Sequence, residues 1–397
     1  MSREGAATSS PNVQVESLTC VRCGRLFPAD EIRGSCTCGG ALLVDYRGSA
    51  GELTPGDVWS YAWLLPVRET RNQVTLGEGA TPLIDCPKAA AALGIEGLLI
   101  KNEGQQPTGT FKGRGAAVSV SRALELGRHD LALATAGNSG IAWAAYAARA
   151  GLTAHVFVPT WTAREAVDTL RALGADVRLV GGPVSTAARI CAEEVAANGW
   201  WSVGAWAEPY RVEGDKTLGL ELLADPRAAS ADVVIWPCAS GIGLVGSWKA
   251  ARDLKRLGMD VAMPALVGAQ SDTCAPLVEA WQAGAADLVQ GGHEWTDVGS
   301  LAKGLLAPAP SAATLVLQAV RETGGTFVAV SDEQLVAAGR LVARTVGLLL
   351  APEAAAGIAA VGLLRDEGTL TRRSRAVVIA TGASRPSDYY GWAELLT

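Results

Sequence analysis

The sequence predicts an α/β fold in which a mainly parallel sheet is covered by helices on both faces. Two observations carry this prediction. Short apolar runs alternate with longer helix-like segments along most of the chain, and strands that alternate with helices build parallel sheets. The chain has 397 residues, 49% of them hydrophobic and 19% charged, which is enough for two lobes with cores of their own.

The predicted strands are short runs of mainly apolar residues. They cover residues 98–100, 131–134, 155–159, 177–180, 233–236, 265–268 and 376–380. Helices are predicted between them, over residues 141–150, 164–173, 186–198 and 244–257. No internal repeat is evident, so a solenoid is not expected.

The N-terminal residues 1–16 are small and polar, and they predict a flexible arm. They lack the apolar centre of a secretion signal, so we expect a cytoplasmic protein. The formal net charge of −6 argues against a nucleic-acid partner, which would need a basic surface. No apolar run approaches the roughly 18 residues that indicate a membrane helix, so no membrane partner is expected either.

Four cysteines lie close together in the sequence: Cys20, Cys23, Cys36 and Cys38. Cys-x2-Cys turns near glycines suit tetrahedral binding of zinc by thiolates, although the second pair, Cys-x-Cys, is more closely spaced than in most zinc ribbons. A ribbon with free thiols and a redox role are the alternatives. If zinc is bound, we expect a closed structural site, remote from the chemistry and in a separate core.

Lys112 is the most informative single residue. It lies in the segment 107–115 (PTGTFKGRG), between Phe111 and glycines, shortly after the predicted strand 98–100. An amine in an apolar pocket near other cations loses its proton more easily, and only the free amine attacks a carbonyl to form a Schiff base. The alternative is a solvated lysine at the start of a helix.

A loop of small residues follows the predicted strand 233–236 and precedes a predicted helix. It consists of Ala239, Ser240, Gly241, Ile242 and Gly243. The N-terminus of a helix offers unpaired N–H groups to an anion, and small residues let the backbone close around a phosphate. The alternative is a tight turn without a ligand.

Two further loops end predicted strands. Thr135, Ala136, Gly137, Asn138 and Ser139 precede a helix, whose N-terminus suits a carboxylate, while the Asn138 amide suits a phenolate. Thr381 ends the strand 376–380. The alternatives are that Asn138 caps its helix and that Thr381 caps a strand end.

Together, these segments resemble the fold type II pyridoxal-phosphate enzymes in order and spacing, in particular the threonine synthase-like family. Further matching segments are residues 77–83 (GEGATPL), 144–151 (AAYAARAG) and 213–219 (EGDKTLG). The resemblance implies two lobes with the cofactor between them. The expected divisions are a ribbon-like segment at 17–46, a large lobe at 47–114 and 211–397, and a small lobe at 115–210.

The resemblance also implies a role for each candidate residue. Lys112 would form the Schiff base with pyridoxal phosphate and move protons, and Asn138 would bind the phenolic oxygen of the cofactor. Thr135, Ala136, Gly137 and Ser139 would hold the substrate carboxylate. The segment 239–243 would hold the cofactor phosphate, and the Thr381 hydroxyl would lie beside the ring nitrogen, where it favours elimination and replacement over transamination.

Several positions depart from the family pattern, and they leave the substrate open. Ala239, Ser240 and Ile242 stand where relatives have glycines and threonine, and Gly113 follows the lysine. We expect Gln106 and Thr110 to replace polar residues that hold a substrate phosphate in relatives.

The predicted function is a lyase that eliminates phosphate from an O-phosphohomoserine-like amino acid and adds water at Cβ. The alternatives are a β-replacement synthase with a phosphoserine- or acetylserine-like donor, a serine or threonine deaminase, and a regulator that binds cofactor without turnover. Relatives are commonly homodimers, so a homodimer is expected.

Overall fold

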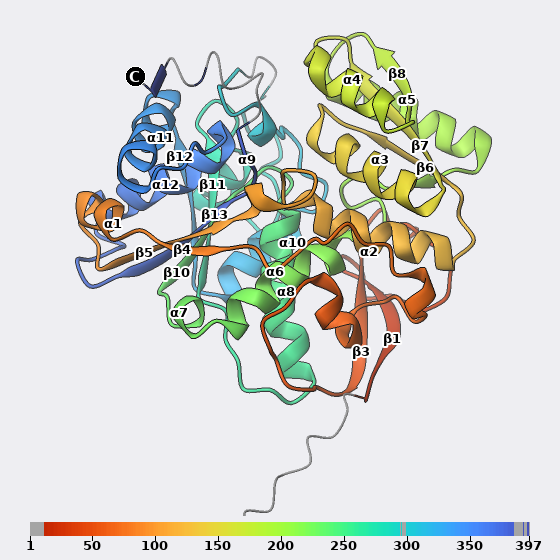
Figure 1. Ribbon diagram of the computed structural model, residues 1–397, viewed down its shortest axis with the longest axis horizontal. Coiled ribbons are helices and arrows are strands. Elements are labelled where there is room, and N and C mark those ends of the chain that lie inside the picture. The colour runs from red at the N-terminus through yellow and green to blue at the C-terminus, as the bar shows by residue number, and fades with distance from the viewer. Residues whose placement is uncertain (1–11, 294, 296–298, 385–391, 393–394, 397) are drawn as a thin grey trace, which may run out of the picture.

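The computed structural model describes residues 12–293, 295, 299–384, 392 and 395–396. Within them lie three sheets (Figure 1). The largest has six strands in the order β12-β11-β10-β13-β5-β4, all parallel except β4 at one edge. Its strands are β4 (Leu83–Asp85), β5 (Gly97–Asn102), β10 (Val233–Pro237), β11 (Ala265–Ser271), β12 (Thr326–Val330) and β13 (Arg375–Ala380).

The second sheet has four parallel strands in the order β8-β7-β6-β9. They are β6 (Asp130–Ala134), β7 (Thr153–Pro159), β8 (Asp176–Val180) and β9 (Trp201–Ser202). All seven predicted strands are present in these two sheets, so the α/β prediction is confirmed. The sequence reading missed β12, although its residues Thr326–Val330 are as apolar as those of its neighbours, and it missed the short strands β4 and β9.

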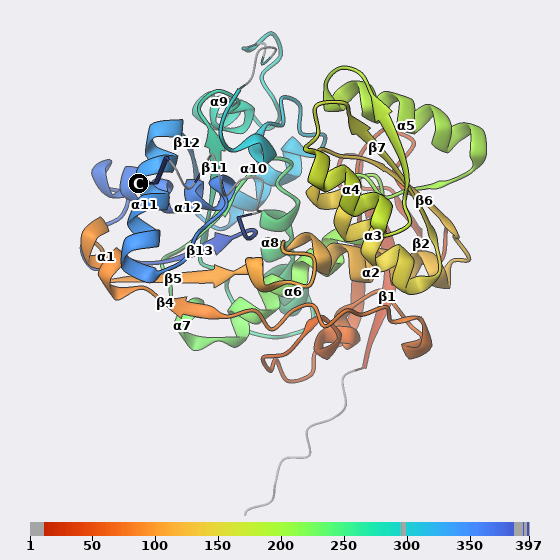
Figure 2. The same ribbon diagram turned by 45° about the horizontal axis from the view of Figure 1, so that its top comes forward.

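Helices cover both sheets (Figures 1 and 2). The α-helices are α1 (Pro87–Leu93), α2 (Lys112–Glu125), α3 (Asn138–Ala150), α4 (Arg164–Ala172), α5 (Val184–Asn198), α6 (Arg211–Ala224), α7 (Pro226–Ala229), α8 (Ile242–Arg256), α9 (Pro276–Gln282), α10 (Ala313–Glu322), α11 (Asp332–Val346) and α12 (Pro352–Asp366). Short 3-10 helices are η1 (Val58–Leu64), η2 (Thr70–Asn72), η3 (Glu103–Gln105) and η4 (Lys303–Leu305). The four predicted helices correspond to α3, α4, α5 and α8.

Helices cover both faces of the six-stranded sheet. Successive side chains of a strand point to opposite faces, so the side chains on both faces are buried. In β10, Val233 and Ile235 join the core beneath α11 and α12, whereas Val234 and Trp236 join the core beneath α8 and α10. A strand covered on both faces therefore reads as a continuous apolar run, which is the signal that predicted it.

The N-terminal sheet is antiparallel, with the order β2-β1-β3. Its strands are β1 (Asn12–Cys20), β2 (Leu26–Pro28) and β3 (Leu42–Ser49). Strand β1 thus begins inside the segment assigned to the arm. The prediction of a separate core for the cysteine-bearing segment is wrong. Leu18, Cys20 and Cys36 belong to the same buried cluster as Phe111 and Trp236, because the small sheet packs its apolar face directly onto the helices beside it.

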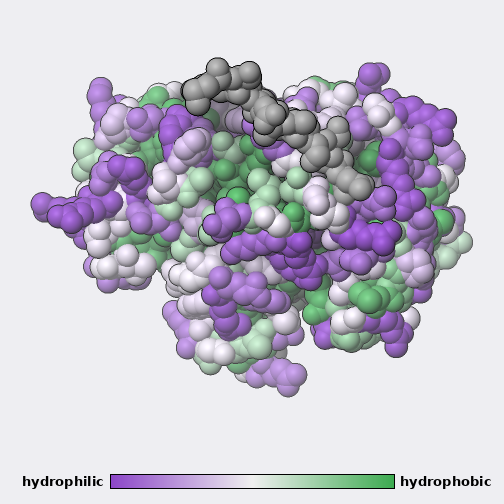
Figure 3. Space-filling model, turned by 90° about the horizontal axis from the view of Figure 1, so that it is seen from below, coloured by the Kyte–Doolittle hydropathy of each residue, from purple (hydrophilic) through white to green (hydrophobic). Residues whose placement is uncertain are grey.

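The surface mixes residue types on the face shown in Figure 3, where hydrophilic residues surround small groups of hydrophobic ones. Among the residues that the structure describes, no helix combines the length and the apolar character needed to cross a bilayer.

Candidate active site

A cleft of about 530 Å³ lies where strands of both large sheets end. The residues to which the family resemblance assigned a role all line it: Lys112, Thr135, Ala136, Gly137, Asn138, Ser139, Ala239, Ser240, Gly241, Ile242, Gly243 and Thr381. Four segments far apart in the sequence are thus brought together. Their individual roles stay predictions.

Strand order explains the meeting of three of these segments. β5, β13 and β10 are parallel neighbours, so the loops at their carboxyl ends lie at the same edge. The loop before Lys112 is bound to the loop of Thr381 by two backbone hydrogen bonds. Phe111 N–H donates to the Thr381 carbonyl at 3.0 Å, and Ala383 N–H donates to the Gly109 carbonyl at 2.9 Å.

Lys112 is the first residue of α2 and is half-buried. Its Nζ lies 4.2 Å from the centre of the Phe111 ring, which in turn meets Trp236 edge to face at 5.6 Å between ring centres. Gly243 leaves room for these rings, because a Cβ there would lie 2.4 Å from the Trp236 ring. The aromatic pair therefore forms the apolar wall that the sequence predicted around the lysine.

Among the helices that begin at the cleft, α2 starts at Lys112, α3 at Asn138 and α8 at Ile242, all within predicted site segments. Their first N–H groups lack partners within the helix and carry the positive end of its dipole. At the start of α8, Gly241 adopts φ 73°, and a Cβ there would lie 2.4 Å from the Val316 side chain. Glycine is therefore required where this loop turns into the helix.

The cleft fits a cofactor with a phosphate and a phenolic oxygen. Within the described residues, the buried Asn138 Oδ1 and the Thr110 Oγ1 have no hydrogen-bond partner, although both residues line the cleft. Buried polar atoms normally have one. Because an amide carries its donor and acceptor on equivalent positions, Asn138 can present N–H to a ligand oxygen.

A buried ionic network supports the start of α2, and the sequence reading missed it. Arg114, fully buried, donates to both carboxylate oxygens of Glu103 at 2.8 and 2.9 Å, and it also binds Glu221. Its remaining bonds go to Thr217 and Thr81. Burial alone would raise the pKa of Glu103, but the Arg114 guanidinium holds that pKa below its ordinary value.

This network joins three of the segments that carry the family resemblance. Thr81 belongs to residues 77–83, Arg114 to residues 107–115 and Thr217 to residues 213–219. Gln106 takes part in the same region: it donates to Glu103 at 2.8 Å and accepts from Gly79 N–H. The prediction that Gln106 faces a substrate is therefore wrong, because its amide is used inside the protein, whereas Thr110 does line the cleft.

Arg211 is a further charged residue of the cleft. It is 3% exposed, its guanidinium lies 4.4 Å from the Trp143 ring centre, and Nη2 donates to Ser139 Oγ at 3.2 Å. Its Nε is buried without a partner in the part of the chain that the structure describes. Burial lowers its pKa, and the nearby Asp215 opposes this. Burial in turn raises the pKa of Asp215 to about 7. Arg211 lies two residues before the segment 213–219, and this proximity was the available signal.

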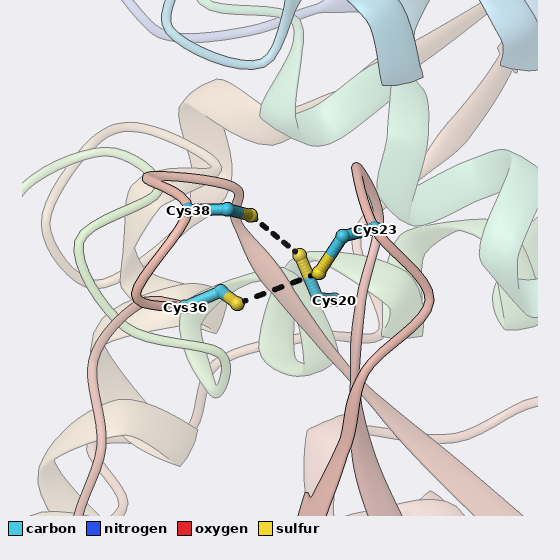
Figure 4. A group of neighbouring side chains, drawn as sticks. All are labelled: Cys20, Cys23, Cys36 and Cys38. Carbon is cyan, nitrogen blue, oxygen red and sulfur yellow. Dashed lines mark hydrogen bonds between the residues drawn. The ribbon is translucent and has the colours of Figure 1, made fainter.

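The four cysteines converge as predicted, and Figure 4 shows their sulfur atoms pointing toward one another. The Sγ atoms of Cys20 and Cys38 are 3.5 Å apart, and those of Cys23 and Cys36 are 3.7 Å apart. Four thiolates at about 2.3 Å from a tetrahedral zinc ion would be about 3.8 Å from one another. The geometry therefore fits zinc, which stays a proposal.

Sequence comparison supplies the family. A family model described as "Pyridoxal-phosphate dependent enzyme" matches residues 74–382. The chain belongs to this family. Pyridoxal phosphate is its cofactor, and the cleft described above fits that group.

Two relatives extend the match over nearly the whole chain. The threonine synthase of Methanosarcina acetivorans is 34% identical over 374 residues, which cover 92% of this chain and 91% of that protein. The threonine synthase of Methanocaldococcus jannaschii is 33% identical over 373 residues, 91% of each chain. These relatives confirm the predicted resemblance and place the chain among the lyases of the family.

Solved structures of the same fold include threonine deaminase isoform 2 from Solanum lycopersicum. It has a TM-score of 0.67 at 22% identity and covers 86% of this chain and 95% of its own. Diaminopropionate ammonia lyase from Escherichia coli has a TM-score of 0.69 at 17% identity and covers 98% and 97%. At these identities the likeness shows the fold alone, which is that of fold type II enzymes.

Proposed function

We propose that the chain is a lyase of the threonine synthase type. It eliminates phosphate from an O-phosphohomoserine-like amino acid and adds water at Cβ. The names of the sequence relatives support the reaction class. The observation that carries the substrate class is Arg211, a buried cation of the cleft whose unpartnered Nε can serve an anion. We further propose a homodimer as the active assembly.

The proposed roles follow from position in the cleft. Bound pyridoxal phosphate withdraws electrons from the substrate, which makes its Cα proton acidic. The Lys112 amine would hold the cofactor covalently and, as a free amine, would accept that proton. The N–H groups at the start of α8, with Ser240, hold the cofactor phosphate. Asn138 donates to the phenolic oxygen, and the Thr381 hydroxyl serves the ring nitrogen.

Two anions of the substrate need separate places. The residues 135–139 at the start of α3 suit the α-carboxylate, because the helix N-terminus favours a negative charge. Arg211 borders this loop through its bond to Ser139, so it can reach a second anion on the same substrate. A charged partner at this point distinguishes a phosphorylated amino acid from serine or threonine.

The substrate is tested by incubating the holoenzyme with O-phosphohomoserine and measuring phosphate and threonine. We expect both products in equal amounts. Arg211→Met should lower kcat/KM for this substrate by about 10- to 150-fold, the equivalent of losing one hydrogen bond to a charged group. The matched control is Arg164→Met, whose side chain is 89% exposed, and it should leave kcat/KM unchanged.

Other products would contradict this function. A ketoacid released from serine or threonine, with no phosphate from O-phosphohomoserine, indicates a deaminase. Turnover only with an added nucleophile indicates a β-replacement synthase. Cofactor binding without turnover of any of these donors indicates a regulator.

The cofactor contacts are tested by Asn138→Ala and Thr381→Ala. Each variant removes one hydrogen bond, so we expect the dissociation constant of pyridoxal phosphate to rise about 2- to 13-fold without unfolding. Absorbance titration of the apoprotein measures the binding, and circular dichroism checks the fold. Unchanged dissociation constants in both variants would contradict the proposed placement of the ring.

A further inference from the structure

The cysteine-bearing sheet is docked on the helices that build the cleft. Tyr46 in β3 donates its hydroxyl to Glu213 Oε2 at 2.7 Å, and Glu213 belongs to the first turn of α6, which begins with Arg211. On the other side, Arg122 in α2 binds the Ala29 carbonyl at 3.3 Å and Asp30 at 3.1 Å. Figures 1 and 2 both show β1 beside α2. The cysteine-bearing segment, including the residues just after β2, therefore touches the two helices that carry Lys112 and Arg211.

The loop between the cysteine pairs contacts residue Ala207, close in sequence to Ala205 of the cleft lining. Gly34 packs against the backbone of Ala207, so tightly that a Cβ at residue 34 would lie 2.3 Å from the Ala207 carbonyl oxygen. Gly34 lies two residues before Cys36. This contact therefore lies beside the turn that carries Cys36 and Cys38.

Ala207 follows Trp206, which contacts the proposed phosphate loop. The Trp206 indole Nε1 donates to the Ser240 carbonyl at 3.0 Å. Trp206 adopts φ 63°, a conformation that a bulky residue keeps only when its surroundings enforce it. Its side chain is buried in the cluster that includes Cys20 and Cys36. One continuous path thus runs from the cysteines through Gly34, Ala207 and Trp206 to Ser240.

We propose that zinc bound by Cys20, Cys23, Cys36 and Cys38 fixes this path and so sets the affinity of the cleft for pyridoxal phosphate. The inference rests on the proposed placement of the cofactor phosphate at residues 239–243. The four sulfur atoms lie within 4.8 Å of one another, so a bound zinc ion would join the two cysteine turns and stabilise the loop between them. Without the metal, the contact between Gly34 and Ala207 loosens. Trp206 then no longer holds the Ser240 carbonyl in a fixed position.

The test compares full-length protein loaded with zinc and protein stripped of metal by a chelator under reducing conditions. Metal content is measured directly, and the dissociation constant of pyridoxal phosphate is measured by absorbance titration. We expect one zinc ion per chain, about a tenfold or larger rise in the dissociation constant on stripping, and recovery when zinc is returned. Hydrogen exchange of residues 33–41 and 203–208 should rise on stripping.

Trp206→Phe tests the path without disturbing the metal site. It keeps an aromatic ring, although a smaller one, and loses the N–H, so zinc content should stay the same while the dissociation constant of the cofactor rises about 2- to 13-fold. The matched control is Trp248→Phe, which loses the indole bond to Glu322 at 2.8 Å and should bind cofactor normally.

Three results would overturn the proposal. If reduced, freshly purified protein contains no zinc, the proposed metal site is wrong. If the protein binds the cofactor equally well with and without zinc, and Trp206→Phe also binds it normally, the metal site is not coupled to cofactor binding. Zinc-loaded protein that fails to bind pyridoxal phosphate at all contradicts the cofactor placement itself, and is thereby distinguished from the other two.

Discussion

Lys112→Ala should abolish turnover while the protein still folds and binds pyridoxal phosphate. Alanine is a good helix former, so α2 should keep its start. The phosphate contacts at residues 239–243 lie on other elements and should still hold the cofactor, although more weakly. Turnover should fall by about 10⁴-fold or more, because the change removes both the covalent attachment and the proton-transferring base.

Steady-state phosphate release measures the loss, and borohydride treatment of the native holoenzyme identifies the attached lysine. Peptide mapping should place the reduced cofactor on Lys112. The matched control is Lys88→Ala, an exposed lysine in α1, which should keep full activity. A label on Lys303, which also lines the cleft, or residual turnover of the Lys112→Ala variant near the native rate would exclude the assignment.

Arg114→Met should destabilise the protein by about 3–5 kcal/mol, the usual cost of removing one partner from a buried charge pair. The change leaves Glu103, which is fully buried, without its counter-charge and leaves Glu221 with only Lys101. Whole domains are stable by only about 5–15 kcal/mol. The variant should therefore unfold at much lower urea concentration.

The pH dependence of this loss has a definite sign. In the native protein the pKa of Glu103 is lowered, so its contribution to stability is present above the unfolded pKa and is lost as the pH falls through the folded value. In the variant, burial without Arg114 should raise that pKa. Stability should then fall as the pH rises, so the deficit should be larger at pH 8 than at pH 5.

Urea unfolding at both pH values measures the effect. Glu103→Gln in the Arg114→Met background should recover part of the lost stability, because it removes the unpaired charge. The matched control is Arg375→Met, which breaks an exposed pair with Glu96 and should cost less than about 1 kcal/mol. Equal losses of unfolding free energy in the Arg114 and Arg375 variants would show that the buried network stabilises the protein no more than an exposed ion pair does.

The sequence by itself determined seven strands of the two large sheets and indicated the chemical character of the site. Val233–Pro237 is covered on both faces and therefore reads as an uninterrupted apolar run, and Lys112 stands out because an aromatic ring and glycines surround it. Local composition carries this information, since strand burial and helix starts depend on residues near in sequence.

The tertiary structure alone decided which distant residues meet. β13 lies between β10 and β5, so the Thr381 carbonyl accepts a hydrogen bond from Phe111, the residue before Lys112. Arg114 likewise pairs with Glu221, a residue far away in the sequence. It also decided that the cysteine-bearing sheet shares the core of the cleft instead of folding apart from it. The physical reason is that strand order, buried charge pairing and the joining of cores depend on contacts between segments far apart in the sequence, which no local pattern records.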